Sequence, residues 1–310
     1  MSRNLALFLV ASAGICWASS GVAVQDFFSH SNKSAMELTN IRMCMAGFFM
    51  LVITILRKRF LNSFVRLNRH KRFWFDVLLY GIIGIVMVQF TYFQAISIGG
   101  AAATTVILSA TPAMVVIWES FYNKKLPTRG EIFAVVLVIV GVFFLVTGGN
   151  IEKLVVPLPC IFWSLASGAT FAFSMIFVKH LFAARIEPIF LTSCGMFLGG
   201  LFTFFLIDDF NLLEFFKSET IFDIVWIIIF GTVVAFMIFN AGLRYLTPEE
   251  TAITGMAEPA SSVVISYFVF GTTFGFIELL GIILVLIAII SPIFFKVLRS
   301  IPKIFVFFCD

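Results

Sequence analysis

Apolar runs of about 18 or more residues recur along the whole chain, separated by short breaks that are charged or rich in turn residues. A helix of this length spans the hydrocarbon core of a bilayer. The chain is 61% hydrophobic and 12% charged, with a mean hydropathy of +1.07, which is more apolar surface than a soluble domain can bury. The sequence therefore predicts an all-α integral membrane protein. Its ten predicted spans lie near 5–25, 37–56, 73–95, 100–122, 129–148, 157–178, 187–207, 221–245, 249–271 and 275–298.

The same composition argues against several other classes of protein. The net charge of +4 comes from Lys and Arg in short connections between spans, so it does not indicate a nucleic-acid-binding protein. The absence of a nucleotide-binding motif argues against an ATP-driven pump. The cysteines lack the spacing of a metal site or a disulfide framework, so we expect no metal and no cofactor. They are Cys16, Cys44, Cys160, Cys194 and Cys309.

Basic residues are distributed unequally between the two sides that alternating spans define. Lys33, Lys153 and Lys217 fall on one side and Arg42 lies within a span, which leaves 17 of the 21 Lys and Arg residues on the side of the N-terminus. Basic residues collect on the cytoplasmic side of membrane proteins. The sequence therefore predicts that the N- and C-termini are cytoplasmic, with residues 301–310 as a cytoplasmic tail.

The chain contains a weak internal repeat. "LSATPAMVVIW" around Pro112 is similar to "GMAEPASSVVI" around Pro259, and each falls in the fourth span of a group of five. "ELTNIRMCMAG" and "FLTSCGMFLGG" likewise open the second span of each group. Because five is an odd number of crossings, the second half must be inserted upside down. We expect two inverted five-helix repeats, over 1–150 and 151–300, which is an architecture of alternating-access carriers with a substrate site near the midplane.

With these motifs the chain resembles the drug/metabolite transporter superfamily, and within it the EamA type. The resemblance rests on "GICWASSGVAVQ", "IRMCMAGFFML", "AAATTVILSATPAMVVIWES", "AEPASSVVISYFVF" and "ELLGIILVLIAI", and it covers nearly the whole chain. It implies a transporter in the inner (plasma) membrane of a bacterium. The family's substrates include amino acids, nucleotide sugars, quaternary ammonium compounds and other metabolites. The Gly-Glu pair often found at the ends of spans four and nine is replaced here by "NKKL" and "GTTF", so no role is carried over to acids at those places.

Glu258 is the foremost candidate for the site, because an ionisable residue inside a membrane span must be offset by a partner or a function. Pro259 cannot donate to the carbonyl of Gly255, which leaves that oxygen for water or substrate. We expect Glu258 to bind a cationic group of the substrate or to carry a coupling proton; the alternative is a protonated acid that only packs against a neighbouring helix. Other polar residues share its helical face within about 100°: Thr251, Thr254, Ser261 and Ser262.

Two further ionisable residues within spans allow two interpretations each. Arg42 lies little more than a turn from the outer end of span two, where it either snorkels to the interface or contacts an anion or carboxylate. Glu119 lies on the same face as Pro112 but close to Lys124 and Lys125, where it either forms an interfacial ion pair or serves as a ligand.

Spans one, three, four, six, eight and nine are expected to line a central cavity, with Pro112 and Pro259 as hinges. A tryptophan near a carboxylate suits a quaternary ammonium group through cation–π attraction. The aromatic and amide candidates for this cavity are Trp17, Gln89, Tyr92, Trp118, Trp163 and Asn240.

The sequence thus predicts a secondary active transporter for a small organic metabolite, an amino acid or a related solute, working by alternating access with or without proton coupling. It would act as a monomer or a homodimer. The alternative substrate is an organic cation, either a quaternary ammonium or sulfonium compound or an exported drug. An intramembrane enzyme would need a clustered nucleophile or metal set, whereas His30, His70 and His180 lie near membrane edges. A channel or lipid scramblase is the other rival, and the inverted repeat argues against it because it predicts a closed site at the midplane.

Overall fold

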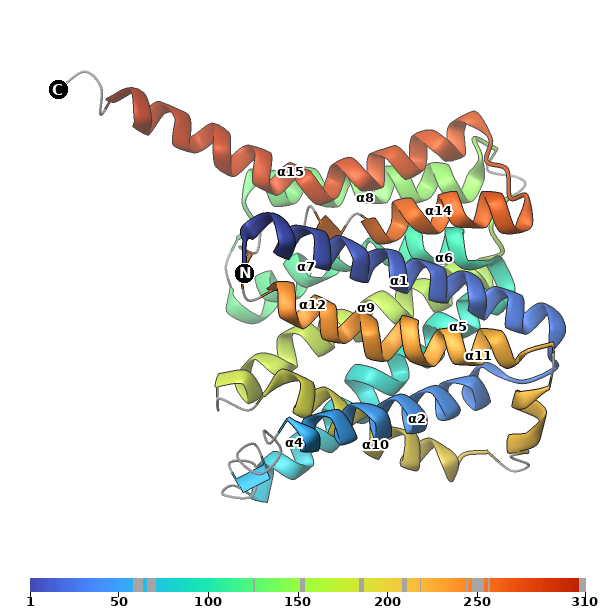
Figure 1. Ribbon diagram of the computed structural model, residues 1–310. Coiled ribbons are helices and arrows are strands. Elements are labelled where there is room, and N and C mark those ends of the chain that lie inside the picture. Colours follow the sequence, from blue (N-terminus) through green and yellow to red (C-terminus); the bar gives the residue numbers. More distant parts are fainter. Residues whose placement is uncertain are drawn as a thin grey trace.

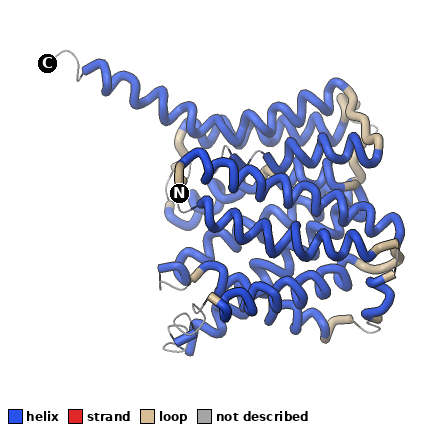
Figure 2. Tube along the Cα trace, in the orientation of Figure 1, coloured by secondary structure: helices blue, strands red, loops and turns tan. Residues whose placement is uncertain are grey.

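The computed structural model is built from helices, joined by loops and turns (Figure 1, Figure 2). It describes residues 1–57, 64–65, 71–124, 126–150, 154–183, 187–207, 211–217, 219–243, 245–246, 254–255 and 257–306. Within these ranges, seven helices are long and apolar enough to cross a membrane. Three shorter apolar helices account for the remaining predicted spans: Pro188–Phe204, Ala257–Phe270 and Phe276–Ser291. The prediction of ten membrane helices is therefore confirmed.

The first half contains five spans, of which the third and fourth each consist of more than one element. The elements are α1 (Arg3–His30), α2 (Ala35–Leu56), α4 (Lys71–Gly81), η1 (Ile82–Val86), α5 (Met87–Gly99), α6 (Ala101–Leu108), α7 (Thr111–Asn123) and α8 (Arg129–Thr147). Capping boxes start two of these helices, with Ser34 and Glu37 at α2 and Thr128 and Glu131 at α8. Each box satisfies backbone N–H groups that the helix itself leaves unpaired.

The second half repeats this order. Its elements are α9 (Leu158–Ala183), α10 (Pro188–Phe204), η2 (Leu212–Phe216), α11 (Ile221–Ile228), η3 (Ile229–Val234), α12 (Ala235–Leu243), α14 (Ala257–Phe270) and α15 (Phe276–Val306). Residues 301–306, expected in a terminal tail, continue α15. Short π-helices, η1 and η3, interrupt the third span of each half, and Gly231 in η3 follows Gly84 in η1 at the same spacing as Pro259 follows Pro112. The internal repeat therefore extends to an irregularity that the sequence did not predict.

Each half places its first helix against the other half. The helix α1 packs against α11, α12 and α14, and α9 packs against α5, α6 and α7. The helix α2 packs against its counterpart α10, and α8 packs against α15. Figure 1 shows α1 and α9 running in opposite directions. This exchange is what an approximate two-fold axis in the plane of the membrane predicts for an inverted repeat.

Small and polar residues allow the paired helices to approach closely. A Cβ on Gly141 of α8 would lie 2.7 Å from the carbonyl oxygen of Gly281 of α15. Between α2 and α10, the buried amide of Asn40 donates to the carbonyl of Gly200 at 2.8 Å and to Thr203 Oγ1 at 3.0 Å. Close backbone packing and interhelical hydrogen bonds are the main forces that join helices in lipid.

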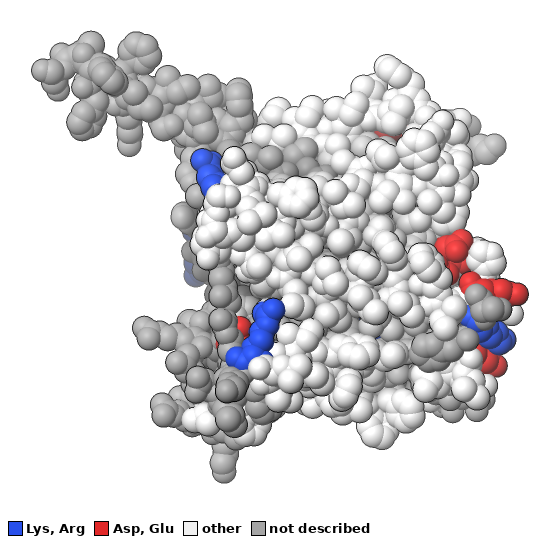
Figure 3. All heavy atoms as spheres, in the orientation of Figure 1, with Lys and Arg blue, Asp and Glu red and all other residues white. Residues whose placement is uncertain are grey.

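Large apolar side chains cover the outside of the bundle; Phe8 and Phe268, for example, are exposed. On the face shown in Figure 3, the described Lys and Arg side chains lie mainly at the end where the N-terminus lies, and Asp and Glu lie mainly at the opposite end, which we call the distal end. The uncharged zone between the two ends suits contact with lipid.

Candidate functional site

Arg42 lies inside the bundle, with only 4% of its surface exposed. Its Nε donates to Thr232 Oγ1 at 2.8 Å, its Nη1 to Gln89 Oε1 at 2.8 Å and its Nη2 to the carbonyl of Gly231 at 3.1 Å. The guanidinium also lies over the ring of Phe93, 5.2 Å from its centroid. Of the two interpretations of Arg42, snorkelling to the membrane surface is therefore wrong, because partners on α5 and η3 hold the side chain in the interior.

The π-helix η3 explains why these acceptors face Arg42. A π-turn disturbs the regular backbone ladder, so that backbone oxygens take other partners. Thr232 Oγ1 donates to the carbonyl of Ile227 at 2.9 Å while it accepts from Arg42, and the carbonyl of Gly231 accepts from Arg42 directly. A Cβ on Gly231 would collide with the hydroxyl of Ser20 in α1, so glycine lets α1 and η3 touch at this point.

A second series of hydrogen bonds crosses the bundle, in addition to the one that Arg42 forms. Ser262 Oγ of α14 donates to Thr105 Oγ1 of α6 at 3.3 Å, and Tyr92 of α5 is 3.1 Å from the same oxygen. Because the single hydroxyl proton of Thr105 goes to the carbonyl of Ala101 at 2.7 Å, Tyr92 is the donor in its contact with Thr105. This series joins α5 and α6 of the first half to α14 of the second.

Glu258 lies in the first turn of α14, on the face that turns into the bundle. A Cβ on Gly14 of α1 would lie 3.1 Å from the backbone nitrogen of Glu258. Ser262, one turn further on, is fully buried, whereas Tyr267 and Phe268 near the end of α14 are exposed. Glu258 itself stays partly accessible. The structure therefore supports the predicted inward polar face of this span for the residues it describes; Thr251 lies outside them.

The carboxylate of Glu258 forms no hydrogen bond with any described residue. Its charge and that of the Arg42 guanidinium attract each other. Gln89, which bonds to Arg42, and Tyr92, which bonds to Thr105, lie one helical turn apart on α5, so this helix links the two series of hydrogen bonds. We call this assembly the central polar site; it consists of Arg42, Gln89, Tyr92, Thr105, Glu258 and Ser262.

The other predicted site residues lie in different surroundings. Trp17 packs on Phe236 and Phe239, with ring centroids 5.5 and 5.1 Å away, and Trp163 packs on Phe90 at 5.6 Å. The two tryptophans thus occupy equivalent places, each between the first helix of one half and the third span of the other.

Asn240 and Trp118 do not join the central polar site. The amide of Asn240 donates to the carbonyl of Phe236 in its own helix at 2.7 Å. Trp118 is 49% exposed on α7. Glu119 belongs to the same helix, but its side chain lies outside the part of the chain that the structure describes, so its two interpretations both stay open.

Both predicted hinge prolines lie where a span is interrupted or begins. Pro112 follows the break between α6 and α7, and the Leu108 carbonyl that it leaves unpaired accepts from the hydroxyl of Thr111 at 2.6 Å. Pro259 is buried in the first turn of α14. Thr111 is the residue before its proline as Glu258 is before Pro259, but its hydroxyl is engaged locally. The second half therefore has an acid before its proline, where the first half has a threonine.

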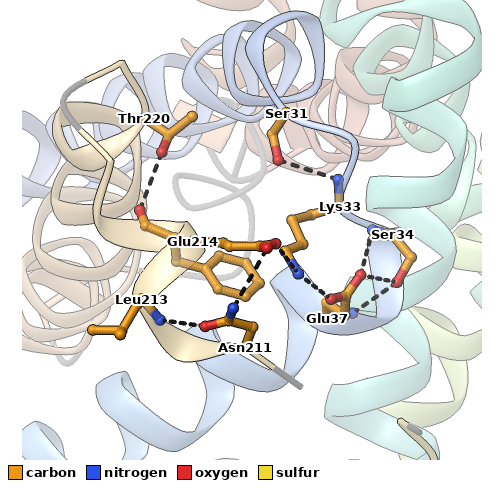
Figure 4. A network of polar contacts seen from close by, with 9 residues as sticks. Ser31, Lys33, Ser34, Glu37, Asn211, Leu213, Glu214 and Thr220 are labelled. Carbon is orange, nitrogen blue, oxygen red and sulfur yellow. Dashed lines mark hydrogen bonds and ion pairs between the residues drawn. The ribbon is translucent and has the colours of Figure 1, made fainter. Parts of the chain in front are cut away.

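Residues of a separate ion network lie at the distal end (Figure 4). Lys33 Nζ lies 2.7 Å from Glu214 Oε2 and 2.9 Å from Glu37 Oε1, and 5.5 Å from the centroid of the Phe215 ring. Asn211 donates to Glu214 at 3.4 Å. The hydrogen bond from Lys33 lowers the pKa of Glu214, and the bonds to Glu214 and Glu37 raise the pKa of Lys33. We call Lys33, Glu37 and Glu214 the distal ion network.

Two inverted halves that exchange their first helices, with the ionisable residues Arg42 and Glu258 in the interior, have the architecture of a membrane transporter. The comparison with protein families gives the same class: residues 4–147 and 158–293 each match the EamA-like transporter family, and the chain belongs to that family. The resemblance seen in the motifs is thereby confirmed, and an intramembrane enzyme is set aside.

Individual proteins are similar over nearly the full length. YicL of Salmonella typhimurium, described as an uncharacterized inner membrane transporter, is 26% identical over 298 residues, which are 93% of this chain and 95% of YicL. One crystal structure of a protein has a similar fold, with a TM-score of 0.63 and 14% sequence identity. The aligned part makes up 94% of this chain and 97% of the chain in that structure. At that identity the likeness shows a shared fold.

Proposed function

We propose that this protein is a secondary active transporter that moves a small organic metabolite, an amino acid or a related solute, across the inner (plasma) membrane by alternating access. The observation that carries the proposal is the carboxylate of Glu258, which is directed into the bundle, partly accessible and without a hydrogen-bond partner among the described residues. An ionisable group in this position is typical of a substrate or proton pathway. The inner-membrane location rests on the similarity to YicL.

The proposed motion uses the exchanged packing of the halves. Because α1 packs on elements of the second half and α9 on elements of the first, a tilt of these helices changes access to the central polar site from both ends. The breaks at Pro112 and Pro259 would absorb the bending, and both termini would lie in the cytoplasm. In this cycle Glu258 binds a cationic group of the substrate or carries the coupling proton.

An organic cation is the second candidate substrate. The aromatic cluster of Trp17, Phe236 and Phe239 supports it, since aromatic faces attract quaternary ammonium groups. The buried positive charge of Arg42, which interacts with Glu258 from within the same site, weighs against a substrate that carries only positive charge.

Counterflow exchange in proteoliposomes tests the proposal. Vesicles loaded with an unlabelled amino acid mixture should accumulate a labelled amino acid transiently and saturably, whereas a channel would only equilibrate it. Glu258→Gln should abolish this accumulation or its dependence on a proton gradient. Glu278→Gln, which neutralises a partly buried acid at the start of α15, is the matched control and should exchange normally. Exchange that is unchanged in Glu258→Gln at every pH would remove Glu258 from the mechanism.

A further inference from the structure

We propose that Arg42 is an anion subsite that binds a carboxylate of the substrate, so that the transported molecule is a small zwitterion held between Arg42 and Glu258. This inference rests on the proposed function, and it adds the part of the site that recognises negative charge.

Arg42 is charged and buried, and none of the described residues forms an ion pair with it. A guanidinium is not deprotonated in proteins, so Arg42 carries its charge into the membrane interior. The three groups that it contacts are all neutral: the amide of Gln89, the hydroxyl of Thr232 and the carbonyl of Gly231. Three of its five N–H groups are used in this way, and the other two have no partner among the described residues. Those two N–H groups are free to donate to an anion.

The opposite charge, Glu258, belongs to the same central polar site but is not bonded to Arg42. Glu258 and Arg42 attract each other, yet each is without a hydrogen bond to the other in the described structure. Two unlike charges held apart inside a membrane suit a ligand that carries both signs. An amine alone would be attracted by Glu258 and repelled by Arg42, and a carboxylate alone would meet the reverse, so either would bind more weakly than a molecule with both groups.

The guanidinium of Arg42 is held in one orientation. Its partners come from α5 and from η3, and Phe93 lies against the face of the guanidinium. The fixed fork geometry of arginine favours a planar carboxylate over a rounded anion. Beside Gly231, Ser20 is 2% exposed, and its hydroxyl has no hydrogen-bond partner among the described residues, so a further neutral donor lies next to the glycine whose carbonyl holds Arg42.

Matched compounds that keep the same skeleton but lack one charged group test the proposal on the full-length protein. The first set is leucine, isoamylamine and 4-methylpentanoate; the second is phenylalanine, phenethylamine and 3-phenylpropanoate; the third is glycine betaine and choline. Affinity is measured from the dependence of the thermal unfolding temperature on ligand concentration in detergent, and each compound is also tested in counterflow. In at least one set the zwitterion should bind roughly tenfold or more tightly than the amine, which is the scale of a charge-assisted hydrogen bond.

The variants Arg42→Met and Arg42→Lys then assign the preference to Arg42. In Arg42→Met the ratio of zwitterion to amine affinity should fall to about one, while Arg42→Lys should keep part of the preference because it keeps the charge but not the fork. The matched control is Arg57→Met, which removes an exposed positive charge at the end of the same helix and should leave the ratio unchanged.

The outcomes separate this inference from the proposed function. A wild-type protein that binds and exchanges the amines at least as well as the zwitterions overturns the anion subsite but leaves a transporter. A folded Arg42→Met that keeps the preference also overturns it. If Arg42→Met does not fold, the wild-type ratios and Arg42→Lys decide. If no compound binds or exchanges in any set, the proposed amino acid transport fails and this inference fails with it.

Discussion

Lys33 Nζ lies 2.7 Å from Glu214 Oε2, and this contact joins the connection between α1 and α2 to the connection between α10 and α11. The two residues belong to different halves of the repeat, and Glu37 at the start of α2 contributes a second carboxylate at 2.9 Å. The hydrogen bond from Lys33 lowers the pKa of Glu214, so the pair is fully charged at neutral pH.

The first prediction is that this pair stabilises the folded protein in a pH-dependent way. Because the pKa of Glu214 is lower in the folded state, its contribution is present above the ordinary glutamate pKa of about 4.3 and is lost as the pH falls through the lowered value. The pKa of Lys33 is raised, so its contribution is present below its ordinary pKa of about 10.4 and is lost as the pH rises through the raised value.

Unfolding temperatures of wild type and Glu214→Gln, measured in detergent from pH 3 to pH 8, check this prediction. The wild type should be slightly more stable at pH 7, and the difference should vanish at the acidic end. Glu219→Gln removes an exposed charge from the same connection and is the matched control for the loss of a charge. An equal difference for Glu214→Gln at all pH values would contradict the ion pair.

The second prediction concerns the hydrogen-bond chain from Tyr92 through Thr105 to Ser262. Tyr92→Phe and Ser262→Ala should each destabilise the protein by about 0.5–1 kcal/mol, because each removes one donor to the Thr105 hydroxyl. Tyr267→Phe removes an exposed hydroxyl from α14 and should change the unfolding temperature little. A destabilisation by Tyr267→Phe as large as that by Tyr92→Phe would show that the buried chain has no special role.

The third prediction concerns the contact between α1 and the start of α14. Gly14→Val should destabilise the protein by about 1–3 kcal/mol and should reduce transport, because a Cβ on Gly14 would lie 3.1 Å from the Glu258 backbone nitrogen. Gly255→Ala has open space at its Cβ and should keep or slightly raise the unfolding temperature. Equal stability of Gly14→Val and wild type would mean that α1 does not pack against α14 as described.

The helices were predictable because membrane spans leave a simple signal. A run of apolar residues long enough to cross lipid can only be a helix or part of a barrel, so the positions of the ten spans followed from the breaks between them. The pairing of Pro112 with Pro259 also revealed the repeat. The interruptions in the third and eighth spans were not predictable, since a π-turn depends on packing around Gly84 and Gly231 rather than on a distinct residue pattern.

The candidate site was predicted in part. Glu258 was identified because a carboxylate inside an apolar run has a cost that demands an explanation, and Gln89 and Tyr92 were identified by their place on the third span. For Arg42 the distance from the end of its helix left two interpretations open, the membrane surface or an anion contact, because its burial depends on acceptors that η3 supplies from 189 and 190 residues further along the chain. No local pattern in the sequence connects Arg42 to Gly231 and Thr232.

The central claim is that the central polar site is reached alternately from the two sides of the membrane, and accessibility at Ser261 tests it most directly. This residue is one turn from Glu258 and partly accessible. Ser261→Cys would be placed in a variant in which the five native cysteines are replaced, and a membrane-impermeant thiol reagent would be applied separately to each side. The account predicts labelling from both sides, with protection by a transported substrate. Labelling from one side only, whatever the substrate, would contradict alternating access.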